Sequence, residues 1–235
     1  MRKEKRFSAL FTCGMPLRPV PDRKTEVRET PAAYPSHKTR PGFDLSLIIS
    51  YICYNKPHYP MKRVLNDLTP LPGNDLFITQ YWFDKQTDPP LHFHEDYMLS
   101  LTLNVKGTRV TGQSVDNFTE KDLIIIFPRV PHCYKRDEAF AETNCEAVAV
   151  QFSRDMPNWQ IFETESMLPI RKMLSQPVAG LWFAESVVDR VRDRLLQLPG
   201  LRGFASASLF LNILNDLATA GPDETGPIGT PYCEM

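Results

Sequence analysis

An alternating pattern between Tyr97 and Val105 constrains the fold of this 235-residue chain more than any other feature. Apolar and mostly polar positions take turns along the segment, with Leu99, Leu101, Leu103 and Val105 in one set and Met98, Ser100, Thr102 and Asn104 in the other. A period of two is typical of a β-strand whose two faces meet different surroundings. We therefore expect a strand here with one apolar face and one largely polar face.

Other segments with the composition of strands surround this one at a spacing of roughly ten residues. They are rich in aromatic and β-branched residues, are separated by Gly and Pro turns, and cover residues 76–83, 108–112, 115–118, 123–127 and 144–152. Short strands at this spacing favour an antiparallel sandwich or a small barrel. The continuous apolar run at 123–127 is typical of a strand that is buried on both faces.

After Arg154 the period becomes helical. One predicted helix carries apolar residues at Ala184, Val187, Val188, Val191, Leu195 and Leu198 and ends at Pro199-Gly200. A second helix carries a stripe formed by Phe210, Ile213, Leu214 and Leu217. These stripes have two interpretations. Either they pack against the barrel and each other, or the second helix forms a dimer interface.

Three histidines lie close to the predicted strands. His92 and His94 share a strand face by parity, and His132 follows a Pro-bounded turn that starts at Pro128. The three can meet only if the sheet curls into a barrel with a polar interior. Buried polar groups without partners cost about 1–3 kcal/mol each, so a bound molecule would satisfy such an interior. The predicted ligand-binding residues are His92, His94, Met98, Ser100, Thr102 and His132.

Two alternatives remain for the histidines. They could be structural side chains that are hydrogen-bonded near the barrel mouth. They could also hold a metal ion, because neutral imidazole suits zinc, iron, copper and nickel. The next inward position is Met98 rather than a carboxylate, and parity turns Glu95 and Cys133 to other faces. We therefore expect no metal and no cofactor, and if a metal binds, its ligands are the three histidines.

The ends of the chain have a different composition. Residues 1–60 are Pro-rich and contain eleven Lys/Arg against five Asp/Glu, with no useful period. They are expected either to be a disordered basic segment or to be a leader upstream of a true start at Met61, and a nucleic-acid-binding arm is a further alternative. Residues 221–235 also lack a period and are expected to form a disordered tail.

Composition limits the location of the protein. Hydrophobic residues make up 42% and charged residues 23%, which is typical of a globular protein. No apolar run approaches the roughly 18–20 residues that a membrane-spanning helix needs. The apolar stretch near the start is too short for a signal peptide. A cytoplasmic protein without a membrane partner is expected.

Two segments, LHFHEDYMLSLTLNVKGTRVTG and FTEKDLIIIFPRVPHCYK, resemble the sensor domain of AraC-type transcription regulators. The matching elements are His92-x-His94, Tyr97, Gly107, Gly112, Asp122-Leu123 and Pro128-x-x-Pro131-His132. The resemblance covers most of residues 64–220. It implies a mainly β fold with C-terminal α structure, namely a cupin-like antiparallel β-barrel (a double-stranded β-helix or jelly roll) followed by two or three helices. Met98 departs from the family, which commonly has Glu there.

The resemblance also implies a division of labour along the chain. Residues 61–155 would form a barrel that binds a small effector, often a sugar or related metabolite in this family, and residues 156–220 would form dimerising helices. The family's helix-turn-helix domain is missing, because residues 221–235 are too few to form one. Residues 61–235 carry sixteen Lys/Arg against twenty-three Asp/Glu, so they offer no basic face for DNA phosphates.

The expected function is therefore that of a truncated, non-enzymatic regulator part that senses a ligand, forms a homodimer and does not bind DNA directly. The rival hypothesis is a small metal-dependent cupin enzyme. Such an isomerase or dioxygenase would use His92, His94 and His132 as metal ligands.

Overall fold

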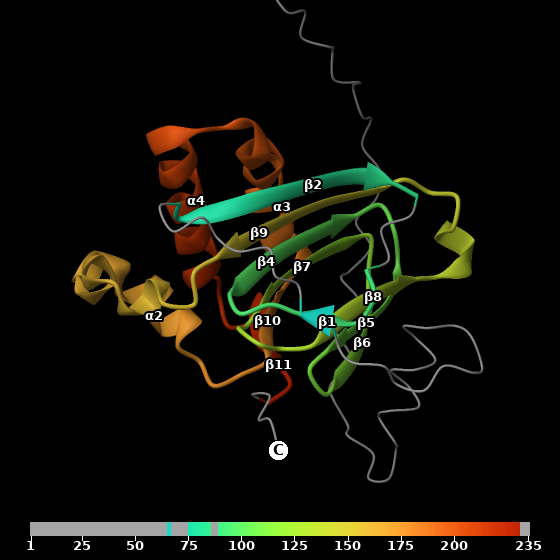
Figure 1. The fold of residues 1–235 in the computed structure, drawn as a ribbon, viewed down its shortest axis with the longest axis horizontal. Coiled ribbons are helices and arrows are strands. Elements are labelled where there is room, and N and C mark those ends of the chain that lie inside the picture. Colours follow the sequence, from blue (N-terminus) through green and yellow to red (C-terminus); the bar gives the residue numbers. More distant parts are fainter. Residues whose placement is uncertain (1–64, 67–74, 86–88, 231–235) are drawn as a thin grey trace, which may run out of the picture. The chain divides into compact units, whose positions relative to one another are not determined.

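Two β-sheets form the framework of the computed structural model, which describes residues 65–66, 75–85 and 89–230 (Figure 1). The smaller sheet has the strand order β1-β3-β8-β5-β6, and the larger sheet has the order β11-β10-β7-β4-β9-β2. All neighbouring strands are antiparallel except β1 and β3, which are parallel. The predicted mainly β fold is confirmed.

Six of the strands match the expected segments closely. The smaller sheet contains β1 (Leu65–Asn66), β3 (His92–Phe93), β8 (His132–Arg136), β5 (Gly107–Thr111) and β6 (Ser114–Phe118). The larger sheet contains β11 (Thr225–Ile228), β10 (Gly180–Phe183), β7 (Lys121–Ile126), β4 (Tyr97–Leu103), β9 (Cys145–Phe152) and β2 (Phe77–Asp84). The alternating segment that opened the sequence analysis is β4, and it lies between β7 and β9.

Helices follow the strands in the second half of the chain. They are α2 (Leu168–Leu174), α3 (Glu185–Gln197) and α4 (Gly203–Ala218). Short 3₁₀ turns connect the elements at η1 (Glu138–Phe140), η2 (Met156–Asn158), η3 (Gln160–Glu163), η4 (Glu165–Met167) and η5 (Leu198–Gly200). Helix α3 has Glu185 in its first turn and Arg194 in its last, which is the favourable arrangement for the helix dipole. Among the described residues, no helix is both long and apolar enough to span a membrane.

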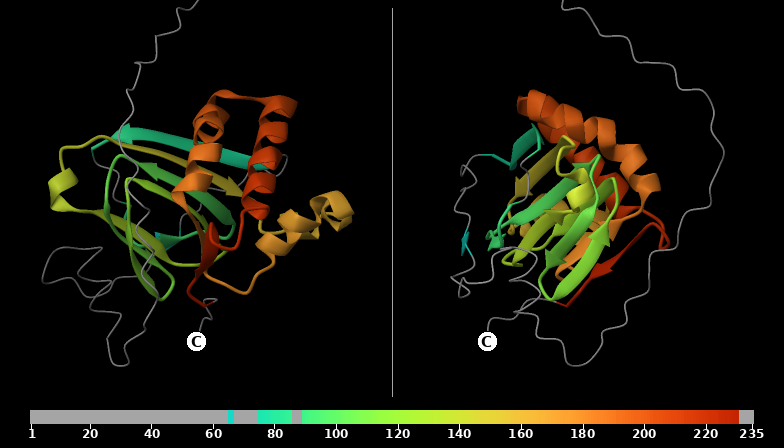
Figure 2. Two further views of the ribbon diagram at one scale, coloured as in Figure 1. Left: turned by 180° about the vertical axis from the view of Figure 1, so that it is seen from behind. Right: turned by 90° about the vertical axis from the view of Figure 1, so that its right-hand side faces the viewer.

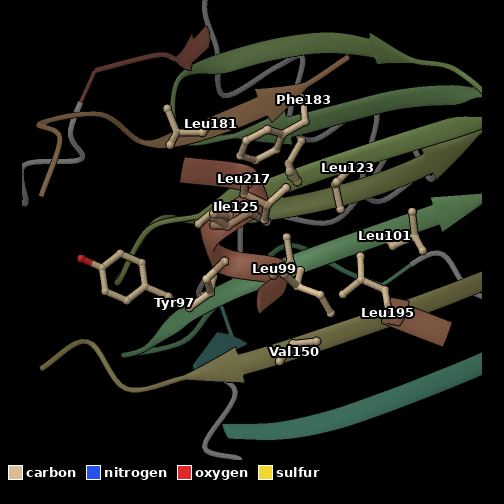
Figure 3. Packing of buried hydrophobic residues seen from close by; sticks show 14 of the residues in the cluster. Tyr97, Leu99, Leu101, Leu123, Ile125, Val150, Leu181, Phe183, Leu195 and Leu217 are labelled. Carbon is tan, nitrogen blue, oxygen red and sulfur yellow. The ribbon is translucent and has the colours of Figure 1, made fainter. Parts of the chain in front are cut away.

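The apolar core lies between the larger sheet and the helices (Figure 3). Leu99 and Leu101 of β4 are fully buried there, together with Ile125 of β7 and Val150 of β9. Helices α3 and α4 lie along this outer face of the larger sheet (Figure 2). Phe210 of α4 packs its ring against sheet residues, with ring centroids 4.4 Å from Phe77 and 5.3 Å from Phe152.

Both helical stripes are buried inside the chain. Val187, Val188, Val191 and Leu195 of α3, and Phe210, Ile213, Leu214 and Leu217 of α4, are each at most 1% exposed. The packing interpretation of the stripes is therefore confirmed. The alternative that the stripe on α4 forms a dimer interface is wrong, because the larger sheet and the neighbouring helices already cover that stripe.

Two strands of the larger sheet lie where none was predicted. Residues 225–228 belong to the segment expected to be a disordered tail, yet they form β11 and pair with β10, and Ile228 is only 1% exposed. Because β10 and β11 complete one end of the larger sheet, the expected barrel boundary at residue 155 is also wrong. Each strand has only four residues, and Gly226 and Pro227 interrupt the alternation of apolar and polar residues that would indicate a strand in β11. The predictions for residues 1–60 and for the start at Met61 lie outside the described residues.

Candidate ligand-binding site

A cavity of about 420 Å³ lies between the two sheets, on the face of the larger sheet that is opposite the helices. Residues of β2, β4 and β9 line it from the larger sheet, and residues of β3 and β8 line it from the smaller sheet. Small-molecule sites in proteins commonly occupy about 300–1,000 Å³. The cavity is therefore large enough for a metabolite.

All six predicted site residues line this cavity: His92, His94, Met98, Ser100, Thr102 and His132. Residues Glu95 and Cys133 do not line it. Glu95 is turned to an ion pair with Arg154, at 2.8 Å, and Cys133 is buried with Leu91 and Val110.

Strand parity is broken at one predicted position. Val105 was expected on the apolar face with the leucines, but it lines the cavity. The reason is that β4 ends at Leu103, and Asn104 has a φ of 70°, which turns the chain before Val105. The period of two therefore holds only as far as the regular strand continues.

The three imidazole rings converge at one end of the cavity. His92 and His132 are directly opposite each other in the β3–β8 pair, and their ring centroids are 4.2 Å apart. The ring centroid of His94 is 4.9 Å from that of His132 and 6.1 Å from that of His92. One candidate ligand nitrogen from each residue lies within 4.8 Å of the other two.

Each ring is oriented by a backbone carbonyl. The Nδ1 atoms of His92, His94 and His132 lie 2.8, 2.8 and 2.9 Å from the carbonyl oxygens of Pro90, Asp96 and Val130. A carbonyl oxygen only accepts hydrogen bonds, so in a neutral ring Nδ1 carries the proton and Nε2 keeps a lone pair.

His132 is the most buried of the three histidines, and it is fully inaccessible. Its Nε2 has no hydrogen-bond partner among the described residues. Burial lowers the pKa of His132 well below its ordinary value, and the nearby rings of His92 and His94 lower it further. The ring is therefore neutral near pH 7, and its Nε2 is available to accept a hydrogen bond or to bind a cation.

Sequence analysis missed several polar side chains that also line the cavity. Tyr134 and Arg136 follow His132 at intervals of two on β8, and Gln151 and Gln80 lie on β9 and β2. The same parity argument that selected Ser100 and Thr102 would have found Tyr134 and Arg136. The glutamines required the register between β2 and β9, which places Gln80 opposite Ala149.

A buried ion pair lies behind Tyr134. Arg109 Nη1 is 2.6 Å from both carboxylate oxygens of Asp122, and Asp116 is 4.0 Å from the same guanidinium group. Burial by itself lowers the pKa of Arg109, but the combined effects of Asp122, Tyr134 and Asp116 outweigh it and raise that pKa above its ordinary value. The Tyr134 hydroxyl lies 3.4 Å from Asp122 Oδ2, to which it donates. Burial and that carboxylate raise the pKa of Tyr134, so the phenol stays protonated.

The lining residues on β2, an edge strand of the larger sheet, include exposed side chains. Trp82 lines the cavity from this strand and is 39% exposed, whereas Ser100 and Thr102 on β4 are each 8% exposed.

No protein-family model and no curated protein matches the chain. Similar solved structures include a cupin 2 conserved barrel domain protein from Rhodopseudomonas palustris, at 15% identity and a TM-score of 0.28, which covers 35% of this chain and 55% of that one. ToxT from Vibrio cholerae is similar at 12% identity and a TM-score of 0.39, with 60% of this chain and 54% of that one covered.

A third similar structure is HEPD from Streptomyces albus, solved with 2-hydroxyethylphosphonate and Fe(II), at 11% identity and a TM-score of 0.25, covering 66% of this chain and 43% of that one. The chain spans about half the length of the first two similar structures. Its own architecture consists of two mostly antiparallel sheets around a cavity, with helices towards the C-terminal end.

Proposed function

We propose that this chain is the effector-binding part of an AraC-type transcription regulator and that the cavity binds a small organic effector. The observation that carries the proposal is the two-faced strand β4. Its inward side chains Met98, Ser100 and Thr102 line the cavity, and its outward leucines pack against the helical layer. A molecule in the cavity therefore contacts the same strand that supports α3 and α4.

The lining suits a polar metabolite such as a sugar or a related compound. Ser100, Thr102 and Gln151 offer hydroxyl and amide groups, while Ile78 and Phe118 offer apolar contacts. Small-molecule sites commonly combine a few oriented polar groups with apolar walls.

The proposal includes a homodimer that forms through the C-terminal helices. Because the main stripe of α4 is buried, the contact would use the outer side of that helix, where Phe204 is 88% exposed. We also propose a cytoplasmic location and no direct contact with DNA, since residues 61–235 carry a net charge of −7.

The test of effector binding is a thermal-shift screen of the full chain against sugars and small metabolites. A true effector raises Tm in the wild type, and Ser100→Trp, which fills the cavity, removes the shift. Val115→Trp is the matched control, because Val115 is exposed on the smaller sheet and does not line the cavity. Regulation is tested by fusing the chain to a DNA-binding domain that works only as a dimer. An effector that leaves reporter expression unchanged would count against the regulator role.

A second function has one observation in its favour. Each of the three imidazoles has its Nδ1 beside a backbone carbonyl, as in many metal-binding histidines, and one nitrogen of each ring lies within 4.8 Å of the other two. In a metal-dependent cupin enzyme His92, His94 and His132 would hold a divalent ion, which would supply Lewis-acid chemistry. Among the described residues no carboxylate joins this group. Metal analysis of protein purified without chelators tests the idea, and substoichiometric metal that His94→Ala does not change would remove it.

A further inference from the structure

We propose that Tyr134 determines which effectors the cavity binds, because it fixes the hydroxyl group of Ser100 as a hydrogen-bond acceptor. The site therefore selects compounds that donate a hydrogen bond to Ser100, such as alcohols, over carbonyl compounds of the same shape. The inference rests on the proposed effector-binding function and narrows the chemical class of the effector. It starts from three side chains on different strands, Ser100 on β4, Asp122 on β7 and Tyr134 on β8.

The phenol proton of Tyr134 is donated to the buried ion pair. The Tyr134 hydroxyl lies 3.4 Å from Asp122 Oδ2, and Arg109, which is directly opposite Tyr134 in the β5–β8 pair, holds the same carboxylate. A carboxylate only accepts hydrogen bonds, and bonds to an ionised acceptor are roughly twice as strong as bonds between neutral groups. Because a phenol has a single proton, the Asp122 carboxylate takes it in preference to the neutral hydroxyl of Ser100.

The phenol oxygen of Tyr134 accepts hydrogen bonds from its other partners. These partners are the side chains of Ser100 and Arg109. Since the proton of Tyr134 is already donated to Asp122, the Ser100 hydroxyl is the donor in its bond to Tyr134. A serine hydroxyl has one proton and two lone pairs, so only the lone pairs of Ser100 Oγ remain for a molecule in the cavity. Both Ser100 and Tyr134 line that cavity.

Burial makes this polarity important for binding. Ser100 and Tyr134 are 8% and 9% exposed, so little water reaches either hydroxyl group. His132 adds a second acceptor to the cavity, because its buried Nε2 has no partner among the described residues and its Nδ1 lies 2.9 Å from the Val130 carbonyl oxygen. An acceptor that meets an acceptor on the ligand stays unsatisfied, which weakens binding. A hydroxyl group on the ligand avoids this loss, whereas a ketone does not.

Titration of the full chain with cyclohexanol and with cyclohexanone, followed by nuclear magnetic resonance, tests the proposal. The two probes share one carbon ring, and only the alcohol has a hydrogen-bond donor. Both are small enough for a cavity of about 420 Å³. The wild type should bind cyclohexanol about fivefold more tightly than cyclohexanone, or better, because the alcohol alone can donate to Ser100.

Tyr134→Phe should reduce this preference by improving the binding of the ketone. Without the phenol oxygen, the proton of Ser100 is free to turn towards the carbonyl group, so cyclohexanone should bind about fivefold more tightly than it binds the wild type. A merely structural role of Tyr134 would weaken the binding of both probes. Tyr97→Phe is the matched control, because Tyr97 is also buried and donates to the Leu174 carbonyl oxygen at 2.7 Å, but does not line the cavity. It should keep the wild-type preference.

Ser100→Ala provides a second measurement if Tyr134→Phe does not fold. This variant removes the acceptor itself, so cyclohexanol should bind about fivefold more weakly than it binds the wild type. Cyclohexanone makes no hydrogen bond to Ser100 in the wild type and should keep its affinity. The two variants thus reduce the preference for the alcohol in opposite ways, one by strengthening the ketone and the other by weakening the alcohol.

Every other result overturns the proposal. Equal affinity of the wild type for the two probes, or tighter binding of cyclohexanone, would show that Ser100 is not fixed as an acceptor. A folded Tyr134→Phe variant with unchanged affinity for cyclohexanone would remove the role of Tyr134. If neither probe binds but a compound from the metabolite screen raises Tm, the inference about Tyr134 fails while the effector-binding function stands. If no compound binds in either experiment, both fail.

Discussion

Arg109 and Asp122 form an ion pair that is almost completely enclosed between the two sheets, with side chains 1% and 2% exposed and an N···O distance of 2.6 Å. They belong to strands β5 and β7 of different sheets, so the pair joins the sheets beside the cavity. The Tyr134 hydroxyl donates to the same carboxylate, which connects the pair to the cavity wall.

Removing one partner of this pair should destabilise the protein strongly. Arg109→Met leaves the Asp122 carboxylate buried without its partner, and we expect a loss of about 3–5 kcal/mol in the free energy of unfolding. The double variant Arg109→Met/Asp122→Leu should recover most of that loss, because no charge of the pair is then left alone. Urea denaturation of both single variants and the double variant gives the coupling energy. Losses that simply add would contradict the interpretation.

Gly107 is required by the close approach of β5 and β8. A Cβ atom at this position would lie 2.1 Å from the carbonyl oxygen of Lys135 and 2.7 Å from the Cα of Arg136. Gly107→Ala should therefore cost about 1–3 kcal/mol through a forced backbone shift. Gly200→Ala is the control, because no atom lies within 4 Å of the added Cβ. Chemical denaturation of the two variants checks the difference, and similar stabilities would show that β8 moves freely.

Glu224 should make the stability depend on pH in the acid range. Hydrogen bonds from Arg190, from the Gly221 amide and from Ser186 lower the pKa of Glu224 from its ordinary value to about 2. Because the folded-state pKa is the lower one, the carboxylate stabilises the fold above the unfolded-state value near 4.5, and this stabilisation is lost as the pH falls towards 2. Urea midpoints measured from about pH 5 to about pH 2 should fall less steeply in Glu224→Gln than in the wild type. Exposed Glu163→Gln should leave the slope unchanged.

Phe204 tests the homodimer. It lies in the first turn of α4 and is 88% exposed, so its ring is available to a second copy. If the outer side of α4 forms the interface, Phe204→Asp should weaken dimerisation about tenfold or more by burying a charge in an apolar contact. Sedimentation velocity over a concentration series measures this. A strictly monomeric wild type, or a dimer that Phe204→Asp leaves intact, would rule out this interface.

Strand faces were predictable from the sequence because β4 is regular. The alternation from Met98 to Leu103 separates cavity residues from core residues as parity requires. The prediction failed at Val105, because the left-handed conformation of Asn104 turns the chain and directs Val105 to the cavity. It also missed Arg109, since nothing in a five-residue strand shows which carboxylate on the opposite sheet will neutralise a buried charge.

Long-range pairing was the harder part to predict. Strands β10 and β11 are short, and long-range pairing stabilises them. Strand β10 pairs with the edge of β7, and β11 then pairs with the other edge of β10. No local period signals such a strand. The helical stripes were visible in the sequence, but only the structure shows that the sheet surface occupies them.

The consequence of placing Ser100 and Leu101 side by side on β4 is genetic. Ser100 lines the cavity, and the next residue, Leu101, packs beneath the helices. A displacement of Ser100 therefore also displaces the backbone of Leu101. Under the proposed function, substitutions at the outward leucines that keep the fold should then change the effector concentration needed for a half-maximal response, although these side chains do not line the cavity. A genetic selection for an altered response to the proposed effector would then recover substitutions on the core face of β4 as well as on its cavity face.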